Sequence, residues 1–462
     1  MIKFGTSGFR GIIDENFNVD NVQKIAFAFR ELVCKKNRQV KIIIGHDNRR
    51  KGSDFAKCFC EAACCDQIRV TFMTVSVPTP FIAFKAKTFD YGVMITASHN
   101  PAQYNGLAFL LHGGRDADDG FSDEIVKLLD KTSFSATPFD ELVKKGLIDF
   151  ESSIDDYVDK VASMVDVKKI KKANLKILFN SMYGSGTDTV KKLFAKIGVK
   201  YNAINDTVDP DFGGRMPAPY AHNLVDMVAM VRDKKYDFGF ALDGDGDRIV
   251  IIDGEGTIFD CNYLAAILVD QKRCGLVKAY LASNLAARVC KKYNLPLFET
   301  RVGFKFLGQL MEQTNTEIAA EQQGIGIKDL SLKKDAVGIV ALVIDAVAKT
   351  DKTIGEMISE IATRVGFPST CVEYAYYYRG DMAALMKKIL SKGVPSFPQK
   401  IVARDDFPDG FRLRFEGDYW CAARASGTED VIRLYTEMPT EKDCLEVIAT
   451  LEKYYGLSEK QK

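Results

Sequence analysis

The chain has 462 residues, of which 47% are hydrophobic and 27% are charged, and its formal net charge is +1. This composition is typical of a globular protein and excludes a disordered chain, and the length predicts about three or four domains instead of one core. Because the net charge is close to zero, it provides no general attraction for nucleic acid or for an anionic membrane, and we expect neither as a partner. Any bound anion must be held by local groups.

The beginning of the chain and its cysteines predict a cytoplasmic protein. Residues 1–11 (MIKFGTSGFRG) contain no apolar stretch like that of a signal peptide, and no apolar run approaches the ~20 residues of a membrane span. Four of the eleven cysteines fall in the segment 58–65 (CFCEAACC), which has no paired CxxC spacing and no histidine nearby. Free thiols on a helix in a reducing compartment fit this segment better than a zinc site.

Strand-like and helix-like segments alternate along most of the chain. Apolar residues recur at helical spacing between Val22 and Val33, and Asp20 is a candidate N-cap of that helix. Three strand-like runs, 40–47, 175–182 and 278–285, each end in polar residues and precede a helix-like segment. Their recurrence predicts three related α/β units.

The last part of the chain follows a different pattern. Residues 411–427 indicate two strands around a Gly-Asp turn, and residues 441–455 indicate a closing amphipathic helix. We therefore predict an α/β protein with four compact domains, of which the last is smaller and of the α+β type. The predicted domains cover residues 1–150, 151–254, 255–367 and 368–462.

The segment 94–101 (MITASHNP) ends a short apolar strand on Ser98 and His99. One interpretation is a polar turn, because Asn-Pro favours turn initiation and proline cannot continue a central strand. The other is that Ser98 carries chemistry at the carboxyl end of a strand, where open α/β sheets have their sites. This segment alone leaves both interpretations open.

The segment 242–253 (LDGDGDRIVIID) is the strongest local indication of chemistry. Asp243, Asp245 and Asp247 alternate with two glycines directly after an apolar strand. The glycines let the backbone curl so that the carboxylates converge, and converging carboxylates repel one another unless a cation lies between them. Oxygen ligands without cysteine or histidine predict a hard ion, Mg²⁺ before Ca²⁺. An EF-hand is a poor fit because Gly254 stands where its last glutamate is required, and the apolar strand that follows makes a solvated acidic turn the weaker interpretation.

The segment 424–437 (RASGTEDVIRLYTE) is a candidate phosphate site. Two hydroxyls, several backbone N–H groups and two arginines fall close together there, as in phosphate sites without a P-loop lysine. A simple turn between strands explains the segment equally well. A third polar, glycine-rich loop, 4–11 (FGTSGFRG), adds Arg10.

Together these loops fit phosphoryl transfer. A serine beside metal-binding aspartates is a candidate phosphoryl carrier, because the metal neutralises charge on the transferring group while arginines hold the rest. A separate phosphate clamp near the end of the chain then predicts a substrate with two phosphorylatable ends.

The motifs TASHNP, DGDGDR and RASGTEDVIRLYTE, in this order, resemble those of the α-D-phosphohexomutase family. The loop FGTSGFRG and the short segments GHDNR, VPTP, DPDFGGRMPAP and TRVGFK extend the resemblance over essentially the whole chain. The resemblance implies a heart-shaped protein with three similar α/β domains and a smaller fourth domain around a central cleft.

The resemblance also implies roles for individual residues. Ser98 would carry a phosphoryl group that Mg²⁺ bridges to Asp243, Asp245 and Asp247, with Arg248 and His99 beside it. The serine would donate this group to a hexose monophosphate, and the resulting hexose 1,6-bisphosphate, which also serves as activator, would reorient and return its other phosphate. The implied clamp for the non-transferring phosphate comprises Arg424, Ser426, Gly427, Thr428 and Arg433. The implied substrate-binding residues are Thr6, Arg10, Lys305, Glu321 and Gln323.

The expected activity is therefore interconversion of hexose 1-phosphate and hexose 6-phosphate, of glucose or mannose, by a monomer or weak homodimer. Its partner is the small sugar phosphate. Phosphoglucosamine mutase is a related alternative. A sugar-phosphate-binding descendant without turnover and a bisphosphate synthase or phosphatase that releases the intermediate are the others.

Three departures from the family pattern keep these alternatives open. Ala108 stands where the family has a lysine near the phosphoserine, Gln323 stands where the sugar loop has a serine, and Asp430 replaces a proline. Loss of one general acid or base costs a factor of about 10² to 10⁴ in rate, so a slower or altered mutase fits the sequence. Lys305 and His112 are candidates to have taken over the lysine's role.

Overall fold

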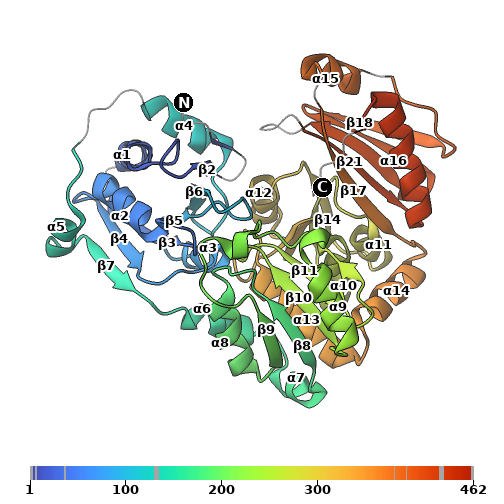
Figure 1. Cartoon of the computed structure of the whole chain (residues 1–462), viewed down its shortest axis with the longest axis horizontal. Helices are drawn as coiled ribbons and strands as arrows, with labels where there is room; N and C mark the ends of the chain where they lie inside the picture. Colours follow the sequence, from blue (N-terminus) through green and yellow to red (C-terminus); the bar gives the residue numbers. More distant parts are fainter. Residues whose placement is uncertain are drawn as a thin grey trace.

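The computed structural model describes residues 4–5, 8–35, 38–129, 135–378, 380–391, 393–425 and 431–458. These residues form four β-sheets with helices packed around them, one sheet in each of four successive parts of the chain, which we call domains 1 to 4 (Figure 1). Domains 1 and 4 lie at opposite ends of the molecule, and domains 2 and 3 lie between them (Figure 1). None of the described helices is long and apolar enough to cross a membrane.

Domain 1 contains a seven-stranded mixed sheet in the order β1-β2-β6-β5-β3-β4-β7. Its strands are β1 Phe4–Gly5, β2 Gly8–Ile12, β3 Val40–His46, β4 Ile68–Met73, β5 Tyr91–Ile95, β6 Tyr104–Leu111 and β7 Ile148–Glu151. Its helices are α1 Val19–Cys34, α2 Gly52–Ala63, α3 Thr79–Lys85, α4 Asp119–Leu129 and α5 Phe139–Lys144.

Domain 2 contains a five-stranded sheet in the order β12-β11-β10-β8-β9. Its strands are β8 Lys176–Asn180, β9 Lys200–Ile204, β10 Phe238–Leu242, β11 Ile249–Asp253 and β12 Ile258–Phe259. Its helices are α6 Asp155–Ala162, α7 Val167–Ala173, α8 Thr187–Ile197 and α9 Val225–Asp233, with short 3₁₀ turns at Phe212–Gly214 and Ala221–Asn223.

Domain 3 contains a four-stranded sheet in the order β14-β13-β15-β16. Its strands are β13 Leu276–Ala279, β14 Leu297–Thr300, β15 Ile318–Glu321 and β16 Gly324–Ile327. Its helices are α10 Cys261–Lys272, α11 Leu285–Lys292, α12 Phe304–Thr314, α13 Ala336–Thr350 and α14 Ile354–Val365.

Domain 4 contains a five-stranded antiparallel sheet in the order β17-β21-β20-β19-β18. Its strands are β17 Thr370–Tyr377, β18 Ile401–Phe407, β19 Gly410–Phe415, β20 Trp420–Ala425 and β21 Val431–Met438. Helices α15 Met382–Leu390 and α16 Glu441–Tyr455 complete it, and a 3₁₀ turn at Glu416–Asp418 joins β19 to β20. The two strands around a Gly-Asp turn and the closing helix predicted from the sequence are confirmed.

Domains 1 to 3 share one strand topology. In each, the first strand of the unit (β3, β8, β13) pairs in parallel with the second (β4, β9, β14) and with the third (β5, β10, β15). The third strand then pairs antiparallel with the strand that follows it (β6, β11, β16). The three related α/β units predicted from the sequence are therefore confirmed at the level of topology.

Helix α1 begins differently from the prediction. Asn18, not Asp20, is its N-cap: the Asn18 side chain accepts a hydrogen bond from the backbone N–H of Asn21 at 2.9 Å. Asp20 lies in the first turn and pairs with Lys24 at 2.6 Å. An acidic residue in the first turn interacts favourably with the helix dipole, which explains why the sequence pattern pointed to the wrong position.

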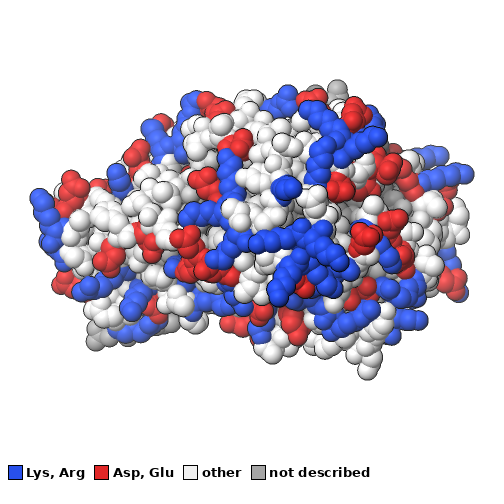
Figure 2. Space-filling model, turned by 90° about the horizontal axis from the view of Figure 1, so that it is seen from below, with Lys and Arg blue, Asp and Glu red and all other residues white. Residues whose placement is uncertain are grey.

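Side chains of both charges cover the face seen in Figure 2, and lysines and arginines gather near its centre. Helix α7, at the lower edge of Figure 1, has four exposed lysines, Lys168, Lys169, Lys171 and Lys172. The net charge of +1 thus hides a local accumulation of positive charge, since the 63 lysines and arginines nearly balance the 62 aspartates and glutamates over the whole chain.

Domains 1 to 3 share one large apolar cluster, and a smaller apolar cluster joins domains 3 and 4. One cluster of buried side chains extends from α3 through β8 to α13, whereas domain 4 packs its sheet and helices around a core of its own. The contact between domains 3 and 4 combines this smaller cluster, which includes Tyr280, Leu281 and Trp420, with a set of polar groups.

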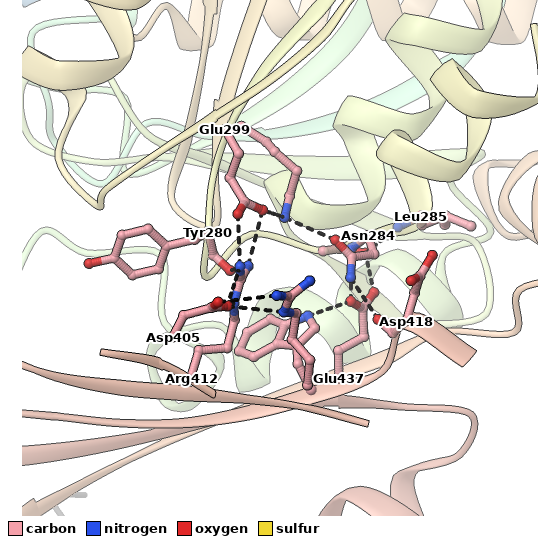
Figure 3. Close-up of polar contacts among 12 residues, drawn as sticks. Tyr280, Asn284, Leu285, Glu299, Asp405, Arg412, Asp418 and Glu437 are labelled. Carbon is pink, nitrogen blue, oxygen red and sulfur yellow. Dashed lines mark hydrogen bonds and ion pairs between the residues drawn. The ribbon is translucent and has the colours of Figure 1, made fainter. Parts of the chain in front are cut away.

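Figure 3 shows that contact, centred on Arg412 of β19 and Glu437 of β21. Arg412 donates two hydrogen bonds to the Glu299 carboxylate, at 2.8 and 3.0 Å, and one to the Tyr280 carbonyl. The Glu437 carboxylate accepts a hydrogen bond across the contact from the Asn284 backbone at 2.8 Å, and within domain 4 it accepts one from the Trp420 indole at 2.7 Å. Charge-assisted bonds of this kind fix domain 4 on domain 3.

We expect this contact to weaken in acid. Burial alone would raise the pKa of Glu299, but Lys278 and Arg412 outweigh it and lower the pKa to about 2. Because the folded pKa lies below the ordinary value of 4.5, the carboxylate stabilises the folded state above about pH 4.5, and this stabilisation is lost as the pH falls towards 2. Glu299→Gln should therefore be less stable at neutral pH and lose less stability on acidification. Parallel curves of unfolding free energy against pH for the two proteins would contradict this.

Candidate active site

Three predicted functional loops occupy equivalent positions in domains 1 to 3. Each joins the third strand of the repeated unit to its antiparallel neighbour: β5 to β6, β10 to β11, and β15 to β16. The first loop contains Ser98 and His99, the second contains the three aspartates, and the third contains Gln323. Because these loops follow the carboxyl ends of central strands, the fold brings them to one place.

Ser98 is held in a strained conformation. Its φ angle of +51° lies in the left-handed region, which costs a non-glycine residue about 1–3 kcal/mol. The Ser98 N–H donates to the Thr96 hydroxyl at 2.8 Å, and that hydroxyl donates to Asp47 at 2.6 Å. Such strain persists only where surrounding bonds impose it, and it turns the Ser98 side chain towards the aspartates.

Arg49 fixes the backbone of this loop through hydrogen bonds to its carbonyl groups. Its buried guanidinium donates to the carbonyls of Ser98 at 2.7 Å and Asn100 at 2.6 Å, and also to those of Pro101 and Tyr104. Asp47 pairs with the same guanidinium at 3.2 Å. One arginine therefore fixes most of the backbone that presents the serine.

The Ser98 hydroxyl contacts both the aspartate loop and His99. Its Oγ donates to Oδ2 of Asp243 at 2.9 Å and lies 3.5 Å from Nδ1 of His99. Burial, reinforced by Asp245 and Asp247, raises the pKa of Asp243 well above its ordinary value. Burial and the nearby Arg248 lower the pKa of His99 well below its ordinary value, so the imidazole is neutral at neutral pH.

The three aspartates form a candidate metal site. Carboxylate oxygens of Asp243, Asp245 and Asp247 lie within 4.8 Å of one another, and all three residues are buried. One oxygen each of Asp245 and Asp247 is buried without a hydrogen-bond partner, which is costly unless a cation is bound. The donors are all oxygen, so the site fits Mg²⁺, as the sequence predicted. A Cβ atom at Gly244 would lie 2.7 Å from the Ser98 carbonyl oxygen, so only glycine permits this approach of the two loops.

Arg248 links the aspartate loop to the third loop. Its Nε lies 3.8 Å from Asp243, and its Nη1 donates to the side-chain oxygen of Gln323 at 2.6 Å. The structure thus brings Arg248 and Gln323 to Ser98 and the aspartates. Arg10 of β2 reaches the serine loop as well, where it donates to the Asn100 side chain at 2.6 Å.

Of the other predicted substrate-binding residues, one lies near the aspartates and one pairs with a residue of domain 1. Glu321 lies 3.8 Å from Lys334, which in turn lies 3.6 Å from Asp247, so Glu321 belongs to the same centre. Lys305 instead pairs with Asp119 of domain 1 at 2.5 Å. Thr6 lies outside the described residues.

The predicted phosphate clamp contains two arginines opposite one another. Arg424 of β20 and Arg433 of β21 are direct partners in the antiparallel ladder. Each already has a carboxylate partner: Arg424 pairs with Asp409, and Arg433 pairs with Glu373 at 2.9 Å. Ser426, Gly427, Thr428 and Asp430 lie outside the described residues.

Neither substitute suggested by the sequence for the lysine missing at position 108 contacts the aspartates within the described part of the chain. Ala108 itself lies buried on β6, opposite Met94. His112 lies with Nδ1 3.1 Å from the Phe89 carbonyl, and Lys305 is engaged by Asp119. Two lysines that do approach the aspartates, Lys333 and Lys334, were given no role in the sequence analysis.

Comparison with known proteins matches the chain to four parts of one family. Residues 1–136, 155–256 and 260–365 match phosphoglucomutase/phosphomannomutase, alpha/beta/alpha domains I, II and III, respectively. Residues 379–452 match the C-terminal domain of the same family. The four matches follow the chain order of the four sheets.

Relatives that match nearly the whole chain are named as sugar-phosphate mutases. The phosphoglucomutase/phosphomannomutase of Thermococcus kodakarensis is 29% identical over 457 residues, which cover 96% of this chain and 96% of that protein. The phosphoglucosamine/phosphogalactosamine mutase of Sulfurisphaera tokodaii is 28% identical over 467 residues, which cover 97% of this chain and 98% of that protein. The open form of parafusin, a phosphoglucomutase from Paramecium, has the same fold, with a TM-score of 0.82 at 20% identity and coverage of 99% and 96%.

Proposed function

Because the chain belongs to the phosphoglucomutase/phosphomannomutase family, whose members are phosphohexomutases, we propose that it interconverts the 1-phosphate and the 6-phosphate of glucose or mannose. The observation that supports this most directly is the hydrogen bond from Ser98 Oγ to Asp243 in the aspartate cluster. It joins a candidate phosphoryl carrier to a candidate Mg²⁺ site, which is the pair of groups that transfer through a phosphoserine requires.

In the proposed reaction, a hydroxyl oxygen of the hexose monophosphate forms a bond to the phosphorus on Ser98 while the Ser98 Oγ–P bond breaks. The hydroxyl proton ends on Ser98 Oγ, and the neutral His99 imidazole is placed to exchange it. The product is a hexose 1,6-bisphosphate, which reorients in the site and returns its other phosphoryl group to Ser98. Mg²⁺ held by Asp243, Asp245 and Asp247 would neutralise charge on the transferring group. Arg248, fixed by Gln323, would face the same group.

A coupled assay tests the activity. Glucose 1-phosphate, mannose 1-phosphate and glucosamine 1-phosphate are each supplied with Mg²⁺ and a trace of glucose 1,6-bisphosphate, and formation of the 6-phosphate is measured. We expect turnover of glucose or mannose phosphate that depends on the bisphosphate. Binding of all three sugars without turnover would instead identify a sugar-phosphate-binding descendant.

Phosphoglucosamine mutase is the second candidate. It is favoured by the relative named phosphoglucosamine/phosphogalactosamine mutase, which is nearly as similar as the phosphoglucomutase/phosphomannomutase. The same assay decides between them, because the preferred sugar is the one with the higher kcat/KM.

We also expect opposite effects from two neighbouring changes in domain 4. Arg433→Met should raise KM for the sugar phosphate by about 10- to 100-fold, because a charge-assisted hydrogen bond to phosphate is lost. Glu373→Gln should lower KM, because the carboxylate that now pairs with Arg433 competes with the incoming phosphate. Steady-state kinetics measure both. An unchanged KM in Arg433→Met would remove this arginine from the phosphate site.

A further inference from the structure

Two consecutive lysines, Lys333 and Lys334, are buried beside the aspartate cluster. They lie between β16 and α13, and their side chains are only 4% and 8% exposed. The ammonium groups of Lys333 and Lys334 lie 3.9 and 3.6 Å, respectively, from Oδ2 of Asp247. Lysine is almost never buried to this extent without a partner or a function, so each of the two requires an explanation.

Lys334 is explained by its place between two carboxylates, Asp247 and Glu321. Lys333 has a different arrangement, because its main partner comes from domain 1. Its Nζ donates to Oδ1 of Asp116 at 2.6 Å, and the Asp116 side chain is as deeply buried as the lysine. The backbone of Asp116 forms an isolated antiparallel β-bridge with Leu110, near the end of β6.

The backbone around this ion pair is fixed from both domains. The Leu332 N–H donates to the Gly113 carbonyl at 3.2 Å, and a Cβ atom at Gly114 would lie 2.9 Å from Ser331. The Lys333 ammonium therefore has little freedom to move away. The ion pair with the buried Asp116 carboxylate favours the charged form of this ammonium.

An ion pair that only joins two domains would need Asp116 alone. The additional approach to Asp247 places the charge next to a carboxylate of the candidate metal site. That site is also linked directly to the serine, since Asp243 accepts from Ser98 Oγ and from the Asp247 N–H. The Lys333 charge therefore lies beside a carboxylate that is linked to the serine.

We propose that Lys333 is a positioning residue of the phosphoryl-transfer centre: anchored by Asp116, it provides a fixed positive charge that holds Asp247 and moderates the affinity of the aspartate cluster for Mg²⁺. Its effect on turnover rests on the proposed function. Its effect on metal affinity does not, because metal binding is measured on the protein alone.

The experiment compares variants that separate charge from structure. Lys333→Met combined with Asp116→Asn removes both charges of the buried pair, so that neither remains without a partner. Asp116→Asn alone keeps the lysine, and Lys333→Arg keeps the positive charge. Lys328→Met, at a partly exposed lysine just after β16, is the matched control. Isothermal titration calorimetry with Mg²⁺ and mutase kinetics are measured for each.

The double variant should bind Mg²⁺ at least about fivefold more tightly, because a cation close to the cluster no longer repels the metal. Its kcat should fall at least about tenfold, with KM within threefold of the parent, because a fixed charge at the reacting centre is lost. Asp116→Asn alone should not bind Mg²⁺ more tightly, and Lys333→Arg should retain most of kcat.

An unchanged Mg²⁺ affinity in the double variant would overturn the proposal and leave a purely structural ion pair. Equal losses of kcat in the double variant and in Lys333→Arg would do the same. If the parent protein has no mutase activity, the proposed function fails, whereas the change in Mg²⁺ affinity still decides the role of Lys333.

Discussion

Ser98→Ala is expected to lose mutase activity by more than about 10⁴-fold, because removal of a covalent nucleophile leaves only binding and charge stabilisation. Alanine deletes the Oγ that donates to Asp243 and retains the backbone that Arg49 holds. The variant should therefore remain folded, and KM for the sugar phosphate, measured on the residual activity, should change little. The coupled assay with glucose 1-phosphate measures the loss, and circular dichroism verifies the fold.

Ser152→Ala is the control, since Ser152 is exposed and lies outside the site. It should have the activity of the parent protein. If Ser98→Ala retained more than a few per cent of parental turnover, another residue would have to carry the phosphoryl group, and the central role of the β5–β6 loop would be wrong.

Asp245→Asn is expected to reduce turnover by about 10³-fold or more, because a metal ion contributes several kcal/mol of charge stabilisation to phosphoryl transfer. The asparagine oxygen can still accept the hydrogen bond that Thr79 donates at 2.6 Å, so the loop should keep its shape. The stability of the metal-free protein should stay the same or increase, since one of three mutually repelling carboxylates becomes neutral.

Thermal unfolding with and without Mg²⁺ tests the metal directly. The parent protein should gain stability with Mg²⁺, because a ligand that binds only the folded state stabilises it. Asp245→Asn should lose most of this gain, and Asp188→Asn, at an exposed position on α8, should retain it. Full turnover in the presence of EDTA would contradict the metal site.

The sequence allowed the prediction of those parts of the site that lie in one segment each. Ser98 and the aspartate loop follow apolar strands and end in residue types with a clear chemistry, so their local patterns predicted two loops that the structure brings into contact. That the loops meet follows from the repeated strand topology, which places them at the same edge of three sheets. The repetition itself could be inferred from the three strand-like runs.

The contacts between segments distant in the sequence could not be predicted. Asp116 and Lys333 come from different domains, and neither lies in a recognisable motif, although two adjacent lysines before Asp335 were visible in the sequence. The carboxylate partners of the clamp arginines, Asp409 and Glu373, likewise depend on how strands of domain 4 pair. Local pattern also misplaced the N-cap of α1, since two polar residues compete there and only the backbone conformation selects Asn18.

The most direct measurement for the whole account is the mass of the intact protein after incubation with Mg²⁺ and glucose 1,6-bisphosphate, followed by peptide mapping. We predict one added phosphoryl group, located on Ser98 and removed when glucose 6-phosphate is then supplied. A protein that gains no phosphoryl group, or gains it on another residue, would contradict the proposed phosphoserine mechanism.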